Sequence, residues 1–327
     1  MEEYKVDILL ATYNGEKYIK EQIDSILNQT YKNISLIISD DSSTDNTVNI
    51  LKEYEKNDKR IKLFLQEKNL GSNKNFEFLL SKISNDYYMF SDQDDVWNKD
   101  KVEMCINEAL KNNADLVFTD LEIVDENLKV LNKSFNRKKR LIRKIMKYND
   151  YRLEYLYNCV TGCTMMAKSS NLVDILPFPG NKDILHDYWI ALISSITGKI
   201  CYIDKATIKY RQHEKNQVGT KRYTSKFDKF NEKRNYIIDL KINKFKTYIE
   251  NDKYFDDNLK KLNKFALNYF LDIKDKKNIN FKGYNVYHKI FKYESIGYYL
   301  FYFVFYNFPV IFRIGYDIFN AFRKIMR

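Results

Sequence analysis

The chain has 327 residues, of which 44% are hydrophobic and 30% are charged. A chain of this length can bury a core without disulfides or structural metals, and this composition excludes disordered and collagen-like proteins. The net charge is +11, and the four cysteines match neither a zinc-site spacing nor a CxxC redox motif. The first residues lack the basic and apolar regions of a secretion signal, so we expect a cytoplasmic protein.

The charge is distributed unevenly along the chain. Residues 1–120 contain 15 basic and 23 acidic residues, whereas residues 121–327 contain 40 basic and 21 acidic residues. An acidic first part is consistent with a carboxylate metal site, and a basic second part with an anionic partner such as nucleic acid or lipid. The alternative is that the lysines of the second part are simply solvated.

Short apolar segments alternate with amphipathic segments through the first 120 residues. The apolar segments predict buried strands at residues 6–11, 34–39, 61–65, 87–90 and 116–119. The segments between them predict helices at residues 18–28, 44–56, 73–84 and 101–112. This alternation predicts an α/β fold with a doubly wound, mainly parallel sheet, whose ligands bind at the carboxyl ends of the strands.

The rest of the chain is less regular. We expect a hairpin turn at residues 125–127, a surface loop or helix start at 137–147 and a second unit from about residue 155. Within that unit the pattern predicts strands at 161–167 and 199–203, a helix at 184–196 and an irregular stretch at 209–219. From about residue 225 the pattern is helical. We therefore expect one domain over residues 1–220, with halves at 1–120 and 121–220, and a helical extension over 221–327.

Polar motifs follow the first two predicted strands. Ala11-Thr-Tyr-Asn-Gly15 follows the first strand, and Asp40-Asp-Ser-Ser-Thr-Asp45 follows the second. A carboxylate at this edge can accept the imide N–H of a pyrimidine base, and the chain has no glycine-rich phosphate loop. The second motif also suits a helix N-cap at Ser43 or Thr44, and both interpretations can hold together.

The fourth predicted strand ends in Ser91-Asp-Gln-Asp-Asp-Val-Trp97. Carboxylates this close together repel one another, so a cation or a hydrogen-bond network must offset the cost. Oxygen ligands suit Mg²⁺ or Mn²⁺, whose shells are completed by water and substrate phosphates. A solvated acidic turn is the alternative.

The three motifs together resemble glycosyltransferase family two, whose members are inverting nucleotide-sugar enzymes with the GT-A fold, a Rossmann-like and mainly parallel sheet flanked by helices. The likeness covers residues 4 to about 219, which would form the catalytic domain. It implies that Asp94 is the ligand of Mg²⁺ or Mn²⁺, and that Asp95 and Trp97 lie near the donor. It also implies nucleotide contacts for Thr12, Tyr13, Asn14, Asp41 and Asp92.

Two later motifs extend the resemblance. His186-Asp-Tyr-Trp189 opens an apolar helix, and the resemblance makes Asp187 the general base, although Asp187 could also simply cap that helix. In Tyr210-Arg-Gln-His213, His213 could ligate the metal or touch the diphosphate, and Arg211 could pair with phosphate or with a carboxylate. The resemblance implies that the sugar pocket includes Gly162, Cys163 and His186, where Gly162 would allow close approach of substrate or form a bulge.

The motifs look most like the bacterial rhamnosyltransferase branch. We therefore expect transfer of L-rhamnose from dTDP-L-rhamnose to a glycan during polysaccharide biosynthesis for the cell envelope, with a UDP-hexose donor as the alternative. The QxxRW signature of processive enzymes is not visible. Two rival classes are nucleotidyl transfer at a carboxylate metal site and nucleic-acid binding through the basic second part. The latter lacks a recognisable reading motif, so we expect no nucleic-acid partner.

The C-terminal tail has an unusual composition. Eighteen uncharged residues lie between Glu294 and Arg313. They reach the minimum length of a membrane span, but four tyrosines, Asn307 and Pro309 suit an interfacial segment better. We expect peripheral contact with the inner face of the cell membrane, where a polyprenyl-diphosphate-linked acceptor would be presented. A buried or subunit-packing helix is the alternative, and the pattern does not predict the oligomeric state.

Overall fold

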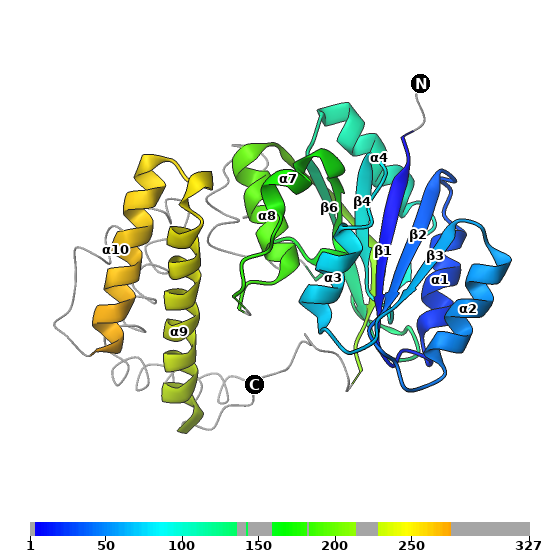
Figure 1. The fold of residues 1–327 in the computed structure, drawn as a ribbon, viewed down its shortest axis with the longest axis horizontal. Coiled ribbons are helices and arrows are strands. Elements are labelled where there is room, and N and C mark those ends of the chain that lie inside the picture. The colour runs from blue at the N-terminus through cyan, green and yellow to red at the C-terminus, as the bar shows by residue number, and fades with distance from the viewer. Residues whose placement is uncertain (1–3, 136–141, 143–158, 182, 214–227, 276–327) are drawn as a thin grey trace, which may run out of the picture. The chain divides into compact units, whose positions relative to one another are not determined.

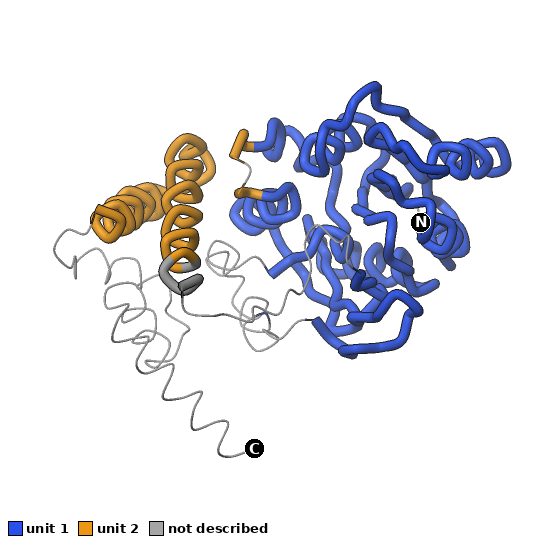
Figure 2. The backbone as a smooth tube through the Cα atoms, turned by 90° about the horizontal axis from the view of Figure 1, so that it is seen from below, with its two compact units in different colours: residues 1–178, 185–220 blue, residues 179–184, 221–327 orange. Residues whose placement is uncertain are grey.

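The computed structural model describes residues 4–135, 142, 159–181, 183–213 and 228–275. The chain forms two compact units (Figure 2). The first unit comprises residues 1–178 and 185–220, and the second comprises residues 179–184 and 221–327. Apart from residue 142, the features predicted at 137–147, near residue 155 and between residues 294 and 313 lie outside the described residues.

One sheet forms the frame of the first unit (Figure 1). Its strand order is β3-β2-β1-β4-β8-β6-β9-β5, and β7 pairs with β6. The strands are β1 (Val6–Thr12), β2 (Ile34–Asp40), β3 (Ile61–Leu65), β4 (Tyr87–Ser91), β5 (Val96–Trp97), β6 (Leu116–Val124), β7 (Val130–Asn132), β8 (Met165–Lys168) and β9 (Ile200–Arg211). Strands β1 to β4 are parallel, as are β6 and β9, whereas β8 runs antiparallel to both β4 and β6. The predicted mainly parallel α/β sheet is confirmed.

Helices connect these strands. They are α1 (Ile19–Leu27), α2 (Thr47–Asn57), α3 (Ser72–Leu80), α4 (Lys101–Asn112), α7 (Leu172–Ile175) and α8 (His186–Thr197). The prediction for 101–112 matches α4, but α2 begins three residues after its predicted start at residue 44. Ser43 and Thr44 are therefore not its N-cap, because loop contacts described below use both residues.

Two predicted strands of the later part differ from the structure. Residues 162–164 form a 3-10 helix before β8, so the strand predicted at 161–167 is shorter and later. Strand β9 runs on to Arg211 because it pairs with β6 along most of its length and with β5 near its end, so residues 209–211 are not irregular. The hairpin turn predicted at 125–127 is confirmed by the pairing of β6 with β7.

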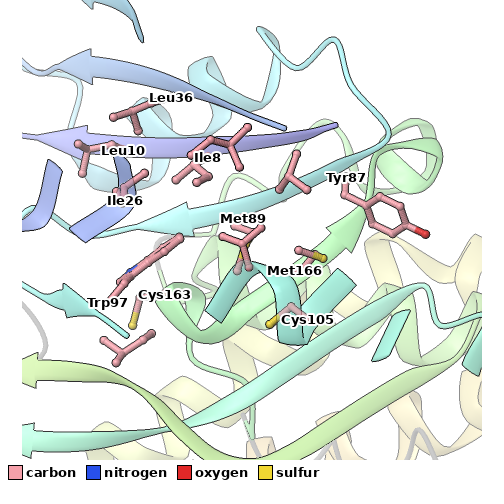
Figure 3. Close-up of a cluster of buried hydrophobic side chains, with 14 of the residues drawn as sticks. Ile8, Leu10, Ile26, Leu36, Tyr87, Met89, Trp97, Cys105, Cys163 and Met166 are labelled. Atoms are coloured by element: carbon pink, nitrogen blue, oxygen red, sulfur yellow. The ribbon is translucent and has the colours of Figure 1, made fainter. Parts of the chain in front are cut away.

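The core follows from the alternation of side chains along the strands. In β1, Val6, Ile8 and Leu10 point into one apolar cluster with residues of α1, α2 and α4 (Figure 3). On the other face, Phe90 of β4 packs edge-on against Phe76 of α3, with ring centroids 5.1 Å apart. Helices therefore cover both faces of the sheet.

Two helices make up most of the described part of the second unit. Helix α9 (Asp228–Glu250) and helix α10 (Asp257–Lys274) are joined through a 3-10 turn, Asp252–Tyr254. Asp256 caps α10 by accepting a hydrogen bond from Leu259 N at 2.8 Å, and Phe245 stacks on Phe270. None of the helices in the described part of the chain combines the length and the apolar character that crossing a membrane requires.

Candidate active site

Five segments meet at one edge of the sheet. The parallel strands β1, β2 and β4 end there, and each is followed by a polar motif. Because β8 is antiparallel to β4, its beginning, with the 3-10 helix that contains Gly162 and Cys163, lies at the same edge. The end of β9 joins them through its pairing with β6. The topology thus gathers the predicted site residues from positions 12 to 213.

The loops after β1 and β2 are tied together by hydrogen bonds. Thr12 Oγ1 donates to Asp40 Oδ2 at 2.8 Å, and Asn14 Oδ1 accepts from Thr44 N at 2.8 Å. Asn14 N in turn donates to Ser43 Oγ at 2.8 Å. Thr12 is buried, whereas Tyr13 is 42% exposed. Thr12 and Asn14 therefore shape the loops, and Tyr13 is the residue of this loop that a ligand can reach.

Asp41 holds a third loop in place. Its Oδ1 accepts from Leu70 N at 2.7 Å and its Oδ2 from Gly71 N at 2.9 Å. A carboxylate oxygen has two lone pairs, so each oxygen retains acceptor capacity after one such bond. Asp41 is 4% exposed, and its backbone N donates to Thr12 O at 2.8 Å, so it lies beside the loop after β1.

Gln93, the residue between Asp92 and Asp94, links the acidic motif to the first loop. Its Oε1 accepts from Tyr13 N at 2.8 Å, and its Nε2 donates to Tyr13 O at 2.9 Å. The side-chain amide thereby pairs with the Tyr13 backbone as a neighbouring strand would. A Cβ at Gly15 would lie 2.3 Å from Gln93 Oε1, so this approach requires glycine there. Sequence reasoning missed Gln93, because its pairing depends on two loops 80 residues apart.

The acids of the motif sit in unequal environments. Asp95 is buried, and burial together with the charge of Asp94 raises the pKa of its carboxyl well above the ordinary value. Burial, then the charges of Asp94 and Asp187, raises the pKa of Asp92 to about 7. These shifts express the free energy that close, desolvated carboxylates cost when they are ionised. A cation at this place would relieve that cost.

Asp94 and His213 come together from segments 119 residues apart. Asp94 Oδ2 and His213 Nε2 are 2.8 Å apart, and the imidazole packs on the Tyr18 ring at a centroid distance of 5.0 Å. A carboxylate oxygen and an imidazole nitrogen that already converge are donors that fit a divalent ion such as Mn²⁺. The two residues predicted as metal ligands therefore lie in mutual contact.

Arg211 contacts a carboxylate rather than open solvent. Its side chain is 2% exposed, and its guanidinium forms an ion pair with Glu21 of α1 and lies 4.5 Å from the Tyr18 ring centroid. Its Nε donates to Asp94 O at 2.8 Å, and its backbone N donates to Asp95 Oδ1 at 3.1 Å. Of the two partners considered for Arg211, the structure contains the carboxylate, and the residue supports the backbone of the acidic motif.

Asp187 lies in the first turn of α8, but it is not the N-cap residue, which is Leu185. Its Oδ2 accepts from Gly162 N at 3.1 Å, and its Oδ1 accepts from Tyr188 N at 2.6 Å. The partial positive charge of the helix N-terminus lies beside this side chain. Asp187 also contributes to the raised pKa of Asp92, which places the two carboxylates near each other.

His186 and Gly162 lie beside Asp187. The His186 ring packs on Phe76 at a centroid distance of 4.3 Å, and its Nδ1 is 3.2 Å from Asn73 Oδ1. A Cβ at Gly162 would lie 3.2 Å from His186 Nε2 and 3.3 Å from Asp187 Cβ. The glycine thus permits these two side chains to approach the backbone closely. The sequence alone did not provide this reason for a glycine at position 162.

Trp97 and Cys163 lie on the interior side of the acidic motif. Both are buried, and Trp97 Nε1 has no hydrogen-bond partner among the described residues. A buried lysine, Lys101, lies over the Trp97 ring and donates to Cys163 O at 2.6 Å. Sequence reasoning treated Lys101 only as the start of an amphipathic helix. The sequence signal that could have pointed to Lys101 was that it closely follows the acidic motif and Trp97.

Comparison with known proteins decides the family. The sequence profile of glycosyl transferase family 2 matches residues 7–172. The chain belongs to this family. This family 2 glycosyltransferase is 33% identical to the dTDP-rhamnosyl transferase RfbG of Shigella flexneri, over 77% of this chain and 88% of the relative. It is 32% identical to the UDP-Glc:alpha-D-GlcNAc-diphosphoundecaprenol beta-1,3-glucosyltransferase WfgD of Escherichia coli, over 59% and 71% of the two chains.

Solved structures show the same fold. S. aureus TarS in complex with UDP-GlcNAc is 17% identical, with a TM-score of 0.56 over 88% of this chain and 80% of TarS. A mannosyltransferase from Pyrobaculum calidifontis, solved with GDP-Man and Mn²⁺, is 15% identical, with a TM-score of 0.51 over 76% of this chain and 64% of the other. The family 2 glycosyltransferase thus has the GT-A fold. Its class is therefore that of a glycosyltransferase and not that of the rival nucleotidyltransferase.

Proposed function

We propose that this glycosyltransferase inverts the anomeric carbon of its donor sugar in a single displacement, with Asp187 as the general base. The observation that carries the proposal is the anchoring of Asp187 by Gly162 N and Tyr188 N at the edge where the acidic motif lies. Asp187 accepts the proton of the acceptor hydroxyl while that oxygen bonds to the anomeric carbon. The bond between the sugar and the diphosphate breaks in the same step, and the nucleoside diphosphate leaves.

We assign the donor's nucleotide and phosphates to the loops after β1, β2 and β4. Tyr13 and Asp41 would hold the base and Asp92 the ribose, with Thr12 and Asn14 supporting the loops through the hydrogen bonds given above. Asp94 and His213 would hold Mg²⁺ or Mn²⁺. The bound ion would offset the charge of the departing diphosphate. Asp95, Trp97, Cys163 and Arg211 would support the pocket floor.

The donor we propose is dTDP-L-rhamnose. Support comes from the Shigella flexneri relative, whose alignment covers most of both chains and whose name specifies a dTDP-rhamnosyl donor. A UDP-hexose is the second candidate, because the Escherichia coli relative is named for UDP-Glc. Both nucleotides carry a pyrimidine base with an imide N–H, which Asp41 could accept, so the sugar pocket must make the distinction.

The acceptor we propose is a polyprenyl-diphosphate-linked glycan at the inner face of the cell membrane. The Escherichia coli relative is named for a diphosphoundecaprenol acceptor. The uncharged aromatic segment between Glu294 and Arg313, with basic residues on both sides, supports peripheral membrane contact. Sedimentation with vesicles tests this contact. We expect binding to anionic vesicles that weakens as the salt concentration rises. If the protein sediments with neither anionic nor neutral vesicles, the proposed contact is contradicted.

The catalytic proposal is tested with a panel of nucleotide-sugars and a lipid-linked acceptor. We expect transfer from dTDP-L-rhamnose in Mn²⁺ or Mg²⁺, and a product whose anomeric configuration, measured by NMR, is opposite to that of the donor. Asp187→Asn should lower kcat by at least about a hundredfold. Asp24→Asn, an exposed carboxylate on α1, serves as the matched control. Normal turnover by Asp187→Asn would overturn the assignment of the base.

A further inference from the structure

An aromatic ring from the start of α1 packs on the proposed metal ligand His213. Tyr18 precedes α1, and its backbone N donates to Gly15 O at 3.0 Å, so it directly follows the loop after β1. The residue is 9% exposed. Its ring centroid lies 5.0 Å from that of the His213 imidazole, and the two ring planes are inclined by 33°. This distance is typical of aromatic pairs that stabilise each other.

The end of β9 brings the imidazole to this ring. Gln212 N donates to Val124 O at 2.9 Å, so the chain stays paired with β6 beyond Arg211. Residues two apart in an extended chain point to the same side of a sheet, and both Arg211 and His213 reach Tyr18. The register of β9 thus fixes the backbone of His213, and Tyr18 contacts its side chain.

The two side chains depend on the Tyr18 ring to different degrees. The Arg211 guanidinium lies 4.5 Å from the ring centroid, but it also forms an ion pair with Glu21 and donates to Asp94 O at 2.8 Å. These bonds would hold Arg211 without the ring. The contact of His213 Nε2 with Asp94 Oδ2 must open when an ion binds between the two atoms, whereas the ring contact can remain. The ring therefore matters most for His213.

We propose that Tyr18 is a positioning residue of the metal site, which holds the His213 imidazole in the orientation that binds the ion. This inference rests on the proposed metal site at Asp94 and His213. Adjacent ligand atoms of an octahedral Mg²⁺ ion, each about 2.1 Å from it, lie about 3 Å apart. Asp94 Oδ2 and His213 Nε2 are 2.8 Å apart, so the imidazole is close to its binding position. A side chain that is already held in place does not have to be ordered by the ion.

Binding of Mn²⁺ in the presence of dTDP, followed by electron paramagnetic resonance of free Mn²⁺, tests the proposal. Tyr18→Leu removes the ring, and we expect the Kd for Mn²⁺ to rise about fivefold, the size of one lost aromatic pair. Tyr18→Phe keeps the ring and removes only a hydroxyl that lies 3.4 Å from Glu126 Oε2. Because so long a hydrogen bond is weak, the Kd of this variant should stay within about twofold of the wild type.

A double-mutant cycle identifies the residue through which Tyr18 acts. In the His213→Ala background, which lacks the imidazole, Tyr18→Leu should weaken Mn²⁺ binding by less than about twofold. A tyrosine with a merely structural role would weaken binding equally in both backgrounds, and that result would overturn the inference.

Tyr87→Leu is a matched control. Tyr87 is 4% exposed, and its ring packs edge-on against Tyr4 with the centroids 5.7 Å apart. It begins β4, whereas the acidic motif follows the end of that strand. This variant also loses a buried tyrosine ring with an aromatic partner, and its Mn²⁺ affinity should equal that of the wild type.

The outcomes separate the two proposals. If the wild type binds no Mn²⁺ with or without dTDP or UDP, or if His213→Ala binds it as tightly as the wild type, the proposed metal site fails. If His213→Ala weakens binding and Tyr18→Leu does not, the metal site stands and the inference about Tyr18 is overturned. Should Tyr18→Leu not fold by circular dichroism, Tyr18→Met, with a longer side chain and no ring, takes its place. An unchanged Kd in that variant would equally overturn the inference.

Discussion

The position of Asp187 depends on Gly162, a residue without a side chain that contacts it. Gly162 donates its N–H to Asp187 Oδ2, and a Cβ on Gly162 would lie 3.3 Å from Asp187 Cβ. That distance is tighter than ordinary carbon contacts, so either the helix start or the 3-10 helix would have to move. The sequence suggested approach of a substrate or a bulge at this glycine, whereas the structure shows approach of the candidate base and of His186.

We therefore expect Gly162→Ala to lower kcat by about tenfold or more while the protein stays folded, since small displacements of a catalytic group have large effects on rate. The KM for the donor should change little. Gly180→Ala is the matched control, because a Cβ there would meet no atom within 4 Å. Initial rates at saturating donor measure the effect, and equal rates for Gly162→Ala and wild type would contradict the anchoring role.

His186 gives a prediction about stability and pH. Burial lowers the pKa of its imidazole, so below the ordinary value near ~6.5 the unfolded chain binds a proton that the folded chain does not. This contribution to stability is present above that pH and is lost as the pH falls through it. His186→Gln should therefore lose less stability than the wild type between pH 7.5 and pH 5.5, as measured by urea unfolding. An equal loss of unfolding free energy in both proteins over this pH range would contradict the prediction.

At the scale of elements, three loops form one binding edge. The loops after β1 and β2 are joined by Thr12, Asn14 and their partners, and Gln93 joins the loop after β4 to them. These bonds explain why α2 begins at Thr47, since Asp45 Oδ1 accepts from Thr47 N at 3.0 Å and Ser43 faces the neighbouring loop. The loops after β1 and β2 and the acidic motif should therefore respond together to a change in Gln93.

Gln93→Glu tests this connection with almost no change in shape. A carboxylate can still accept from Tyr13 N, but it cannot donate to Tyr13 O and it adds charge beside Asp92 and Asp94. We expect the Kd for dTDP or UDP to rise about tenfold, the size of one lost hydrogen bond with an unsatisfied partner. Calorimetry measures this change. Asn49→Asp, on the exposed part of α2, adds the same charge as a control, and an equal effect of both variants would argue against a specific link.

At the scale of the whole molecule, ligand binding and stability are linked. The first 120 residues carry an excess of acids, and the acidic motif concentrates part of that charge in a desolvated place. A ligand that binds only the folded state stabilises it by about 2.7 kcal/mol at a hundred times its Kd. A divalent ion with a nucleotide should therefore stabilise the fold noticeably.

We expect Mn²⁺ with dTDP or UDP to raise the melting temperature by several degrees, and EDTA to reverse most of the increase. Asp94→Asn should remove the Mn²⁺-dependent part, because it takes away the carboxylate that meets His213. Differential scanning fluorimetry of wild type and variant provides the measurement. A rise that is the same in the variant would show that the ion binds elsewhere.

The sequence by itself determined the class of fold and the edge at which the site lies. Strands and helices of the first part follow from apolar periodicity, which is a local property, and the parallel arrangement sends every loop after a strand to one edge. For this reason the motifs at Thr12, Asp41 and Asp94 could be placed near one another, and the match of α4 to residues 101–112 is complete.

Only the tertiary structure decided which side chains meet. The Arg211 and Glu21 pair spans 190 residues, and the Asp94 and His213 pair spans 119 residues. Such pairs depend on the register between β9 and β6 and on where each loop turns, which no local pattern encodes. Burial of Lys101 is decided in the same way: an ammonium group is normally solvated, and only the packing of Trp97 and Cys163 around it removes it from water.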